Sequence, residues 1–480
     1  MGVRSRFVVG WMVFSARTGS RSSLRGLARS PIFWPGVVRM RIDGGSEEVD
    51  MRKVGLIFPY FRTRSQTEML FPPLGLAWLA AQLSRLGLES KIFDCTFGTD
   101  TQLRRDIESY GPDIVGIYSM ASLTRNTFEI AEMVRASFPD VPIVAGGPLP
   151  TLFPARYGLP FDAVFRGEAD LSFPNFCRDF FDLKASRQRL ERLPLRTYPG
   201  LFIHNQSLHI ENPTVHHTEL EIASFPLPDR SGFDHNAYQN EWFRESGAKT
   251  TSIITTFGCP FDCDFCSKSV FGSSYRQRDL GTVFEEIEQI CRLGYDSLWI
   301  ADDTFTLNLR HLESFCEGMK GREISWSCLS RANGIDEAMV SRMKQAGCRR
   351  VYLGLESGSP ETLKLMDKRI TVNEGINAVH QYRQAGIQVA AFFIVGYPGE
   401  TVESIESTFK LALTLPLDYI SFNVPYPLPG SRLFERLSGL EEGRDWSREN
   451  EITFVYRSEF DADWLKRRIA ETMMAFGARS

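Results

Sequence analysis

Short apolar runs alternate with amphipathic stretches over residues 51–185 and again over residues 246–438. In the first of these regions the runs have the length of buried strands, and the stretches between them have helical periodicity. Strands separated by helices predict a doubly wound parallel sheet, which binds ligands at the carboxyl ends of its strands. The expected strands are 54–58, 90–94, 113–118, 141–145 and 162–165, with helices at 73–86, 101–110 and 124–138.

The second region repeats the strand–helix pattern six times. A closed barrel of this kind has eight repeats, so the pattern predicts a partial, TIM-like (β/α)6 barrel. Such enzymes place their chemistry on the loops that follow the strands. The expected strands are 251–256, 297–301, 324–330, 350–354, 388–395 and 419–424, and the helices between them include 282–293 and 336–346.

Three further segments flank these regions. Residues 186–245 alternate strand-like pieces with Pro-rich stretches, which indicates a linker with a small hairpin. Residues 439–480 contain one expected helix, 462–476, as a C-terminal helical cap. Residues 1–50 differ in composition, because the first 42 residues carry eight arginines and no acidic residue. A transit peptide would have this composition, but we favour a disordered extension or a misassigned start, with translation beginning at Met51.

The overall composition is that of a globular protein, with 43% hydrophobic and 24% charged residues among 480. A net charge of −4 gives no electrostatic reason to expect a nucleic-acid partner. No apolar run is long enough to cross a membrane, so no membrane partner is expected. The nine cysteines are mostly isolated and do not form a disulfide framework, which favours the reducing cytoplasm.

Three of these cysteines, Cys259, Cys263 and Cys266, lie within eight residues directly after the first strand of the second region. Cys thiolates hold iron–sulfur clusters, and a 4Fe–4S cluster with three protein ligands keeps one iron open, as catalytic metal sites do. The alternative is a zinc knuckle in a non-catalytic binding protein, which needs a fourth Cys or His. The next thiols, Cys291 and Cys316, stand singly in expected helices.

The spacing Cys-x-x-x-Cys-x-Phe-Cys resembles the signature of the radical S-adenosylmethionine (SAM) superfamily. The resemblance covers residues 250–435. It implies that the open iron binds the amino and carboxylate groups of SAM, and that one electron cleaves SAM into methionine and a 5′-deoxyadenosyl radical. It also implies a small-molecule substrate and an electron donor such as flavodoxin or ferredoxin.

The same resemblance implies SAM contacts at the ends of the later strands. Asp302 and Asp303 match the position of the usual Gly-Gly-Glu motif, which this chain lacks. An arginine at the barrel mouth suits a carboxylate, and a carboxylate with a hydroxyl suits ribose or the SAM amine. Each position also has an ordinary alternative, such as a helix cap, a turn or a surface ion pair. The expected SAM residues are Asp302, Asp303, Arg331, Glu356, Ser357 and Gly396.

The first region resembles the cobalamin-binding domains, with a flavodoxin-like sheet, that precede some radical SAM barrels. The segments concerned are 72–82, 146–148 and 165–170. The Asp-x-His-x-x-Gly motif that ligates cobalt is absent, because no histidine precedes His204. The resemblance implies cobalamin contacts at Ser119, Met120, Gly146 and Gly147. The alternative is a flavodoxin-like domain that has lost its cofactor.

Together these patterns predict a cobalamin-associated radical SAM enzyme that functionalises an unactivated carbon. Methyl transfer through methylcobalamin is the preferred reaction. The alternative within the same group is an oxidative cyclase or rearrangement enzyme acting on a tetrapyrrole or natural product, as in the anaerobic magnesium-protoporphyrin ester cyclase. The domains expected are therefore a cobalamin-binding domain at 51–185, a linker at 186–245 and a radical SAM barrel at 246–438.

Overall fold

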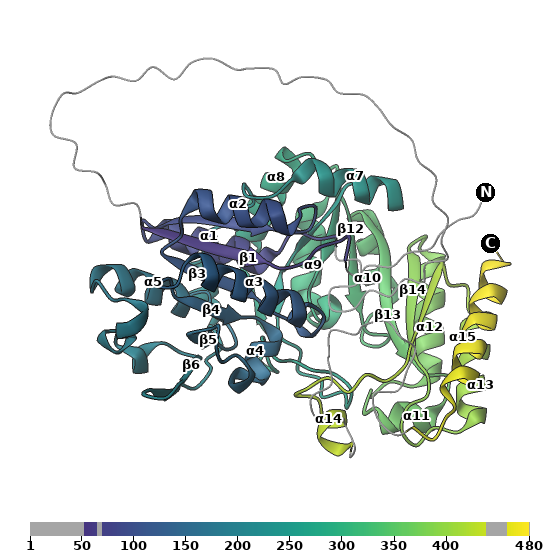
Figure 1. Cartoon of the computed structure of the whole chain (residues 1–480). Helices are drawn as coiled ribbons and strands as arrows, with labels where there is room; N and C mark the ends of the chain where they lie inside the picture. The colour runs from purple at the N-terminus through teal and green to yellow at the C-terminus, as the bar shows by residue number, and fades with distance from the viewer. Residues whose placement is uncertain (1–51, 65–69, 438–457, 480) are drawn as a thin grey trace, which may run out of the picture.

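The computed structural model describes residues 52–64, 70–437 and 458–479. Two α/β units follow one another along the chain, the first in purple and blue and the second in green (Figure 1). The expectations for residues 1–50, and those for residues 439–457 of the C-terminal cap, lie outside the described part.

The first sheet has the strand order β2-β1-β3-β4-β5-β6-β7. Its first five strands are all parallel, as the alternating pattern predicted. The chain runs from β1 to β2 on one side and then returns to β3 on the other side of β1. The strand order therefore reverses at β1, and doubly wound sheets bind ligands outside the carboxyl ends of the strands at such a reversal. The strands are β1 (Lys53–Phe58), β2 (Glu89–Asp94), β3 (Ile114–Tyr118), β4 (Ile143–Gly146) and β5 (Ala163–Phe165).

Helices cover both faces of this sheet. One buried cluster joins the sheet to α1 (Leu74–Arg85) and α5 (Ser172–Asp182), and a second cluster joins its other face to α2 (Asp100–Tyr110) and α3 (Thr124–Ser137). Alternate residues of a strand point to opposite faces, so Leu56 belongs to the first cluster and Ile57 to the second. A short helix, α4 (Pro148–Leu152), follows β4.

Residues 186–245 contain the predicted small hairpin and, in addition, two helices. A hairpin of β6 (Leu201–His204) and β7 (His209–Glu211) adds to β5 in antiparallel orientation and so extends the first sheet. Pairing with β6 satisfies the edge of β5, which would otherwise present unpaired backbone groups. Two helices follow, α6 (Glu219–Ala223) and α7 (His235–Ser246).

The second sheet is parallel throughout, in the order β15-β14-β13-β12-β11-β8. It ends at β8 and β15, which are not paired with each other in the described residues, so the barrel is partial as predicted. Its strands are β8 (Thr250–Ile253), β11 (Ser297–Ile300), β12 (Ser325–Ser330), β13 (Cys348–Glu356), β14 (Gln388–Ile394) and β15 (Tyr419–Asn423).

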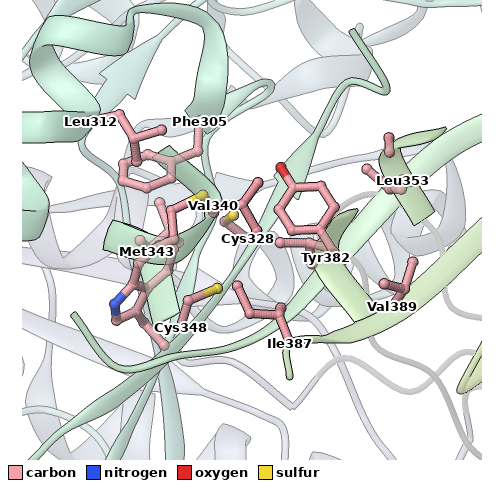
Figure 2. Close-up of a cluster of buried hydrophobic side chains, with 14 of the residues drawn as sticks. Phe305, Leu312, Cys328, Val340, Met343, Cys348, Leu353, Tyr382, Ile387 and Val389 are labelled. Carbon is pink, nitrogen blue, oxygen red and sulfur yellow. The ribbon is translucent and has the colours of Figure 1, made fainter. Parts of the chain in front are cut away.

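Helices pack on the outer face of this sheet around a large apolar core. Figure 2 shows side chains of β12, β13 and β14, such as Cys328, Leu353 and Val389, facing Met343 and Tyr382 from the helices. The helices are α8 (Leu280–Arg292), α9 (Leu309–Met319), α10 (Glu337–Gln345), α11 (Pro360–Leu365), α12 (Val372–Gln384) and α13 (Val402–Thr414).

The first strand of the barrel is shorter than predicted. β8 stops at Ile253, and after a gap of two residues the chain forms a separate element, β9 (Thr256–Phe257). β9 pairs in antiparallel orientation with β10 (Arg276–Gln277). The three cysteines lie in the loop that this small hairpin encloses.

The C-terminal helix α15 (Ala462–Gly477) matches the predicted helix 462–476 and lies against α13 (Figure 1). Leu465 and Ile469 share an apolar cluster with Ile405 and Phe409. A shorter helix, α14 (Arg432–Arg436), precedes it along the chain. Within the described ranges, none of the helices has both the length and the apolar character needed to span a bilayer.

Candidate active site

The loop of Cys259, Cys263 and Cys266 follows the first barrel strand, where (β/α) barrels carry their chemistry. All three thiols are free: Cys263 is buried, Cys259 is half-buried and Cys266 is exposed. The Cys266 amide donates to the Cys263 carbonyl (3.0 Å), so this part of the loop forms a tight turn. Although Cys266 is exposed as a residue, the protein around its sulfur desolvates the thiolate. This desolvation and the nearby Cys263, Asp303 and Cys259 raise the pKa of the thiol to about 12. The three thiols therefore share one environment.

The two metal sites considered for these thiols differ in geometry. In the described part of the chain, no group of three or more His, Cys, Asp or Glu side chains could hold a metal ion as placed. A single zinc ion binds each of its thiolates at a Zn–S distance of about 2.3 Å. In an iron–sulfur cubane, the thiolates bind to different irons. Three thiols on one loop match the number of protein ligands expected for a cluster with one open iron.

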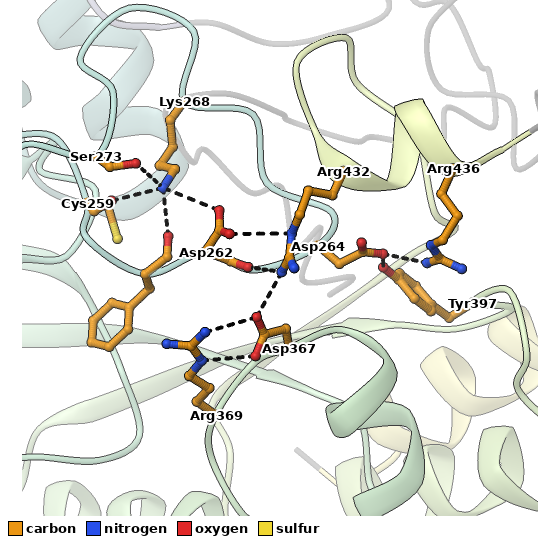
Figure 3. Close-up of polar contacts among 11 residues, drawn as sticks. Cys259, Asp262, Asp264, Lys268, Ser273, Asp367, Arg369, Tyr397, Arg432 and Arg436 are labelled. Carbon is orange, nitrogen blue, oxygen red and sulfur yellow. Dashed lines mark hydrogen bonds and ion pairs between the residues drawn. The ribbon is translucent and has the colours of Figure 1, made fainter.

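Lys268 holds the cysteine loop from within. Its Nζ donates to the carbonyl oxygens of Cys259 (3.2 Å) and Phe261 (2.9 Å) and to the hydroxyl of Ser273 (2.7 Å). Figure 3 shows this ammonium group at the centre of the contacts. Because one cation gathers acceptors from both arms of the loop, it restrains the path of the chain between the first two cysteines.

Two aspartates between the cysteines tie the loop to other elements (Figure 3). Asp262 contacts Arg432 of α14, which also forms an ion pair with Asp367 (2.8 Å). Asp264 is buried, and its carboxylate accepts from Tyr397 after β14 and from Arg436 of α14, both at 2.5 Å. These side chains anchor the loop to the opposite side of the barrel mouth.

The two aspartates predicted after the second barrel strand have different roles. Asp302 is buried, and its carboxylate accepts from the Thr255 amide (2.6 Å), the Thr255 hydroxyl (2.6 Å) and the Thr256 hydroxyl (2.7 Å). It therefore joins the end of β11 to the segment that leads into β9. Asp303 is exposed and lies near Cys266, close enough to raise the pKa of that thiol. Of the pair, Asp303 is the one available to a ligand.

Arg331, at the end of β12, is buried beside the cysteines. Its guanidinium carbon lies 3.6 Å from the centre of the Phe261 ring, and Nη1 lies 4.0 Å from the Cys263 sulfur. Nη2 donates to the carbonyl of Lys368, and Nε has no hydrogen-bond partner although it is buried. A buried cation with an unused donor next to three thiols suits an anionic ligand such as a carboxylate.

Lys368 is a second buried cation at the same place. Its Nζ donates to Glu356 Oε1 (2.6 Å). Its positive charge offsets part of the rise in the pKa of Cys266. Glu356 ends β13 with a φ of 61°, after a register shift against β14. No local pattern marks Lys368, because it follows a tight turn after α11 in which Asp367 and Arg369 both have positive φ.

Ser357 and Gly396, the remaining predicted SAM residues, lie after β13 and β14. Ser357 is buried, and its hydroxyl pairs with Thr408 (3.0 Å) and accepts from the Ser359 amide (3.1 Å). Gly396 has a φ of 81°, which starts a turn closed by Glu400, whose carboxylate accepts from the Tyr397 amide (2.7 Å). Burial raises the pKa of Glu400 to about 7.

The predicted cobalamin contacts gather at the carboxyl ends of β3 and β4. The Ser119 hydroxyl is buried and pairs with the Tyr157 hydroxyl (2.7 Å), and Met120 follows it. Gly147 has a φ of 111°, and a Cβ there would lie 2.6 Å from the Ser119 carbonyl, so the fold itself requires this glycine. A Cβ on Gly146 would meet only one atom, at 3.8 Å. The open side of Gly146 lets a flat ligand approach the backbone.

Comparison with known proteins agrees with this geometry. Residues 253–412 match the Radical SAM superfamily, and residues 64–176 match the B12 binding domain. The chain is 32% identical to an uncharacterized methyltransferase of Pyrococcus horikoshii, over 76% of this chain and 78% of the relative. It is 26% identical to the anaerobic magnesium-protoporphyrin IX monomethyl ester cyclase of Rubrivivax gelatinosus, over 81% of this chain and 70% of the relative.

A solved structure has the same fold. The radical SAM methyltransferase TsrM of Kitasatospora setae, with tryptophan substrate and a SAM analogue bound, superposes with a TM-score of 0.67. The match covers 80% of this chain and 75% of TsrM at 20% sequence identity, so it concerns the fold alone.

Proposed function

Because this chain belongs to the radical SAM superfamily and carries a B12 binding domain ahead of its radical SAM domain, we propose that it is a cobalamin-dependent radical SAM methyltransferase. Its cofactors are a 4Fe–4S cluster, SAM and cobalamin. The substrate is a small molecule with an unactivated carbon. The observation that carries the proposal is the loop of Cys259, Cys263 and Cys266 at the mouth of the barrel, beside two buried cations, Arg331 and Lys368.

In this proposal the three cysteines hold the cluster, and their loop keeps its shape through Lys268. When bound, the cofactors supply an electron for the reductive cleavage of SAM and a carrier for the methyl group. Thiolates concentrate negative charge, and Arg331 and Lys368 offset it. The free Nε of Arg331 is the donor we assign to the carboxylate of SAM.

The amino group of SAM needs acceptors at the same mouth. Asp303 is exposed there, whereas the carboxylate of Asp302 is taken up by Thr255 and Thr256. Glu356 is held by Lys368. We therefore assign the amine to Asp303, with Glu356 nearby as the charge partner of Lys368. Asp302 positions the strand end that leads to the cysteines.

Cobalamin would sit at the carboxyl ends of β3 and β4, against Gly146, Gly147, Ser119 and Met120. Three observations support this location. The strand order reverses at β1, Gly146 is open on one side, and the matched B12 binding domain spans these strands. Methyl transfer requires this edge to face the cysteine loop.

Two other functions are less favoured. An oxidative cyclase would use the same cofactors, but the cyclase relative matches at 26% identity and the methyltransferase relative at 32%. A zinc-stabilised binding protein does not agree with membership of the radical SAM superfamily. The electron donor, which we propose to be a flavodoxin or ferredoxin, and a cytoplasmic location are expectations from the requirement for a low-potential electron and for protection from oxygen.

Anaerobic purification of the full chain tests the proposal. We expect a brown protein that contains four irons, four sulfides and one corrin per chain. It should release 5′-deoxyadenosine from SAM when a strong reductant is added. The mass of a product formed from a trial substrate distinguishes methylation from cyclisation, because methylation adds one methyl unit. A colourless protein that binds zinc and leaves SAM intact would overturn the proposal.

A further inference from the structure

Glu168 has no role in the site described above, although it is almost fully buried. It lies in the first unit, directly after β5, and its side chain is 2% exposed. A buried carboxylate is costly unless it is paired. Glu168 has three partners: Arg276 Nη1 on Oε2 (2.8 Å), the His217 amide on Oε2 (3.0 Å) and the His216 ring on Oε1 (2.8 Å).

Arg276 belongs to the barrel unit, in β10, and is 6% exposed. Its planar guanidinium has donors on both edges, which is the reason Arg and not Lys suits such a position. One edge reaches Glu168, and the other donors reach the carbonyls of Phe271 and Ser274, each at 3.1 Å. Arg276 therefore connects Glu168 to the returning arm of the cysteine loop.

That arm lies directly on the start of the cysteine loop. A Cβ on Gly258 would lie 2.4 Å from the Ser274 carbonyl and 2.9 Å from the Phe271 carbonyl, the two groups that Arg276 holds. The next residue, Cys259, donates its amide to the Gly272 carbonyl (3.3 Å). His216, the partner of Glu168, packs on Gly272 from the other side. A shift of the Glu168 carboxylate would therefore displace the arm to which the Cys259 amide is hydrogen-bonded.

Glu168 is also joined to the other end of the path, the edge assigned to cobalamin. Its neighbour Gly167 donates its amide to the Thr151 hydroxyl (2.8 Å). The same hydroxyl donates to the Gly147 carbonyl (2.8 Å). Hydrogen bonds therefore link Gly147 to Thr151, Thr151 to the backbone of Gly167 and Glu168 to Arg276. Arg276 in turn holds the backbone of residues 271–274, which bonds to Cys259.

We propose that Glu168 is a positioning residue that acts through Arg276 to fix the cysteine loop relative to the edge formed by β3 and β4, and that it couples ligand binding at this edge to the order of the loop. The proposal rests on the function assigned above, in which the cluster lies on that loop and cobalamin at that edge. Coupling of this kind is measured as a change in the loop caused by a ligand bound at the β3–β4 edge.

Hydrogen exchange of the full chain, prepared anaerobically, measures the order of the loop. In Glu168→Gln we expect amides of residues 258–276 to exchange about tenfold faster than in the unsubstituted chain. Iron should also pass to a chelator about tenfold faster, as it does when groups that support metal ligands are removed. The matched control is Glu211→Gln, which breaks an ion pair to Arg166 (2.8 Å) with a half-exposed carboxylate and should change neither quantity.

The coupling is tested by a separate measurement, the effect of cobalamin on hydrogen exchange in the loop. This effect would be the same in Glu168→Gln if Glu168 had only a structural role. Adding hydroxocobalamin should slow exchange in residues 258–276 of the unsubstituted chain and of Glu211→Gln. In Glu168→Gln it should still bind, by its absorbance, but should leave the exchange of the loop unchanged. Arg276→Lys keeps a cation opposite Glu168 but cannot hold both carbonyls, so it should loosen the loop while the melting temperature stays within the range of the control.

Unchanged exchange and iron release in Glu168→Gln would overturn the proposal. If that variant does not fold, the double variant E168Q/R276Q, which leaves no unpaired buried charge, takes its place with the same expected result. Failure of the proposed function looks different. An unsubstituted chain that binds neither iron nor corrin refutes the cofactor assignment, while the exchange of the loop still decides whether Glu168 positions it.

Discussion

Asp302 and Asp303 are adjacent in the chain and lie in opposite surroundings. Asp302 is 1% exposed and accepts hydrogen bonds from Thr255 and Thr256, whereas Asp303 is exposed near Cys266. Burial raises the pKa of Asp302 to about 6, even though these hydrogen bonds lower it. Asp302 therefore supports the strand end, and Asp303 is the member of the pair that we propose contacts SAM.

This difference predicts a pH dependence of stability. The pKa of Asp302 is higher in the folded chain than in the unfolded chain, so between about pH 4 and pH 6 the folded chain holds a proton that the unfolded chain has released. The contribution of Asp302 to the free energy of unfolding should therefore fall by about 3 kcal/mol as the pH rises through this window. Urea denaturation of the unsubstituted chain and of Asp302→Asn should show this difference. Asp463→Asn, which replaces an exposed carboxylate of α15, serves as the control, and a difference that does not vary with pH would contradict the assignment.

Replacing one of the three loop cysteines should remove the iron–sulfur cluster without removing cobalamin. Cys263→Ala should leave two thiols and lose the cluster, so iron per chain and the release of 5′-deoxyadenosine should both fall to background. Cobalamin absorbance should persist, because the first sheet is untouched. Cys291→Ala, an exposed cysteine of α8, is the matched control and should keep both cofactors. Retained SAM cleavage in Cys263→Ala would exclude this thiol as a ligand.

At the scale of elements, the β9–β10 hairpin determines where the cysteines lie. The chain leaves β8, forms two residues of β9, turns at Gly258 with a φ of 77°, and returns in β10. The returning arm approaches so closely that a side chain at Gly258 has no space. The hairpin thus uses a glycine both for its left-handed backbone and for the contact between its arms.

Gly258→Ala should therefore cost more than backbone strain alone. We expect a loss of about 2–3 kcal/mol in unfolding free energy, together with weaker iron retention. Gly247→Ala is the matched control, since Gly247 has a φ of 69° but no atom within 4 Å of the added Cβ. It should cost about 1 kcal/mol and keep its iron. Equal effects in the two variants would show that the contact between the arms is unimportant.

At the scale of the molecule, the linker holds the two units together. The Asp229 amide donates to the Ala77 carbonyl of α1 (3.0 Å), and the Trp242 indole donates to the Leu70 carbonyl (2.6 Å). Arg230, which lies between Asp229 and Trp242 in the chain, contacts the barrel unit. It is 1% exposed and pairs with Glu286 of α8 (2.6 Å). Arg278 pairs with the same carboxylate (2.7 Å). The linker is thus fixed to both units.

Removing this buried cation should destabilise the whole chain. Arg230→Met keeps the length of the side chain but leaves the carboxylate of Glu286 with one partner, so we expect a loss of about 3 kcal/mol in urea denaturation. Arg468→Met is the control, because Arg468 pairs with Glu406 in a half-exposed position on α15 and should cost less than about 1 kcal/mol. Similar losses in the two variants would mean that Arg230 does not secure the linker.

Much of this organisation follows from local pattern. Five parallel strands in the first sheet, six in the second and the helix near the C-terminus appear where the alternation of apolar and polar residues predicted them. The cysteine spacing likewise identified the loop that we propose carries the cluster. These features depend on neighbours within a few residues in the chain, because strand and helix periodicity and the spacing of ligands on one loop are local properties.

Other features depend on contacts between distant residues, which no local pattern records. Lys368 reaches the site through a turn with positive φ, Glu168 meets Arg276 across 108 positions, and the β6–β7 hairpin joins a sheet edge that the sequence left open. The choice between Asp302 and Asp303 was also decided by packing. The sequence by itself determined which elements form and which loop holds the thiols, and the tertiary structure decided which charges surround them, because burial and pairing exist only once the chain has folded.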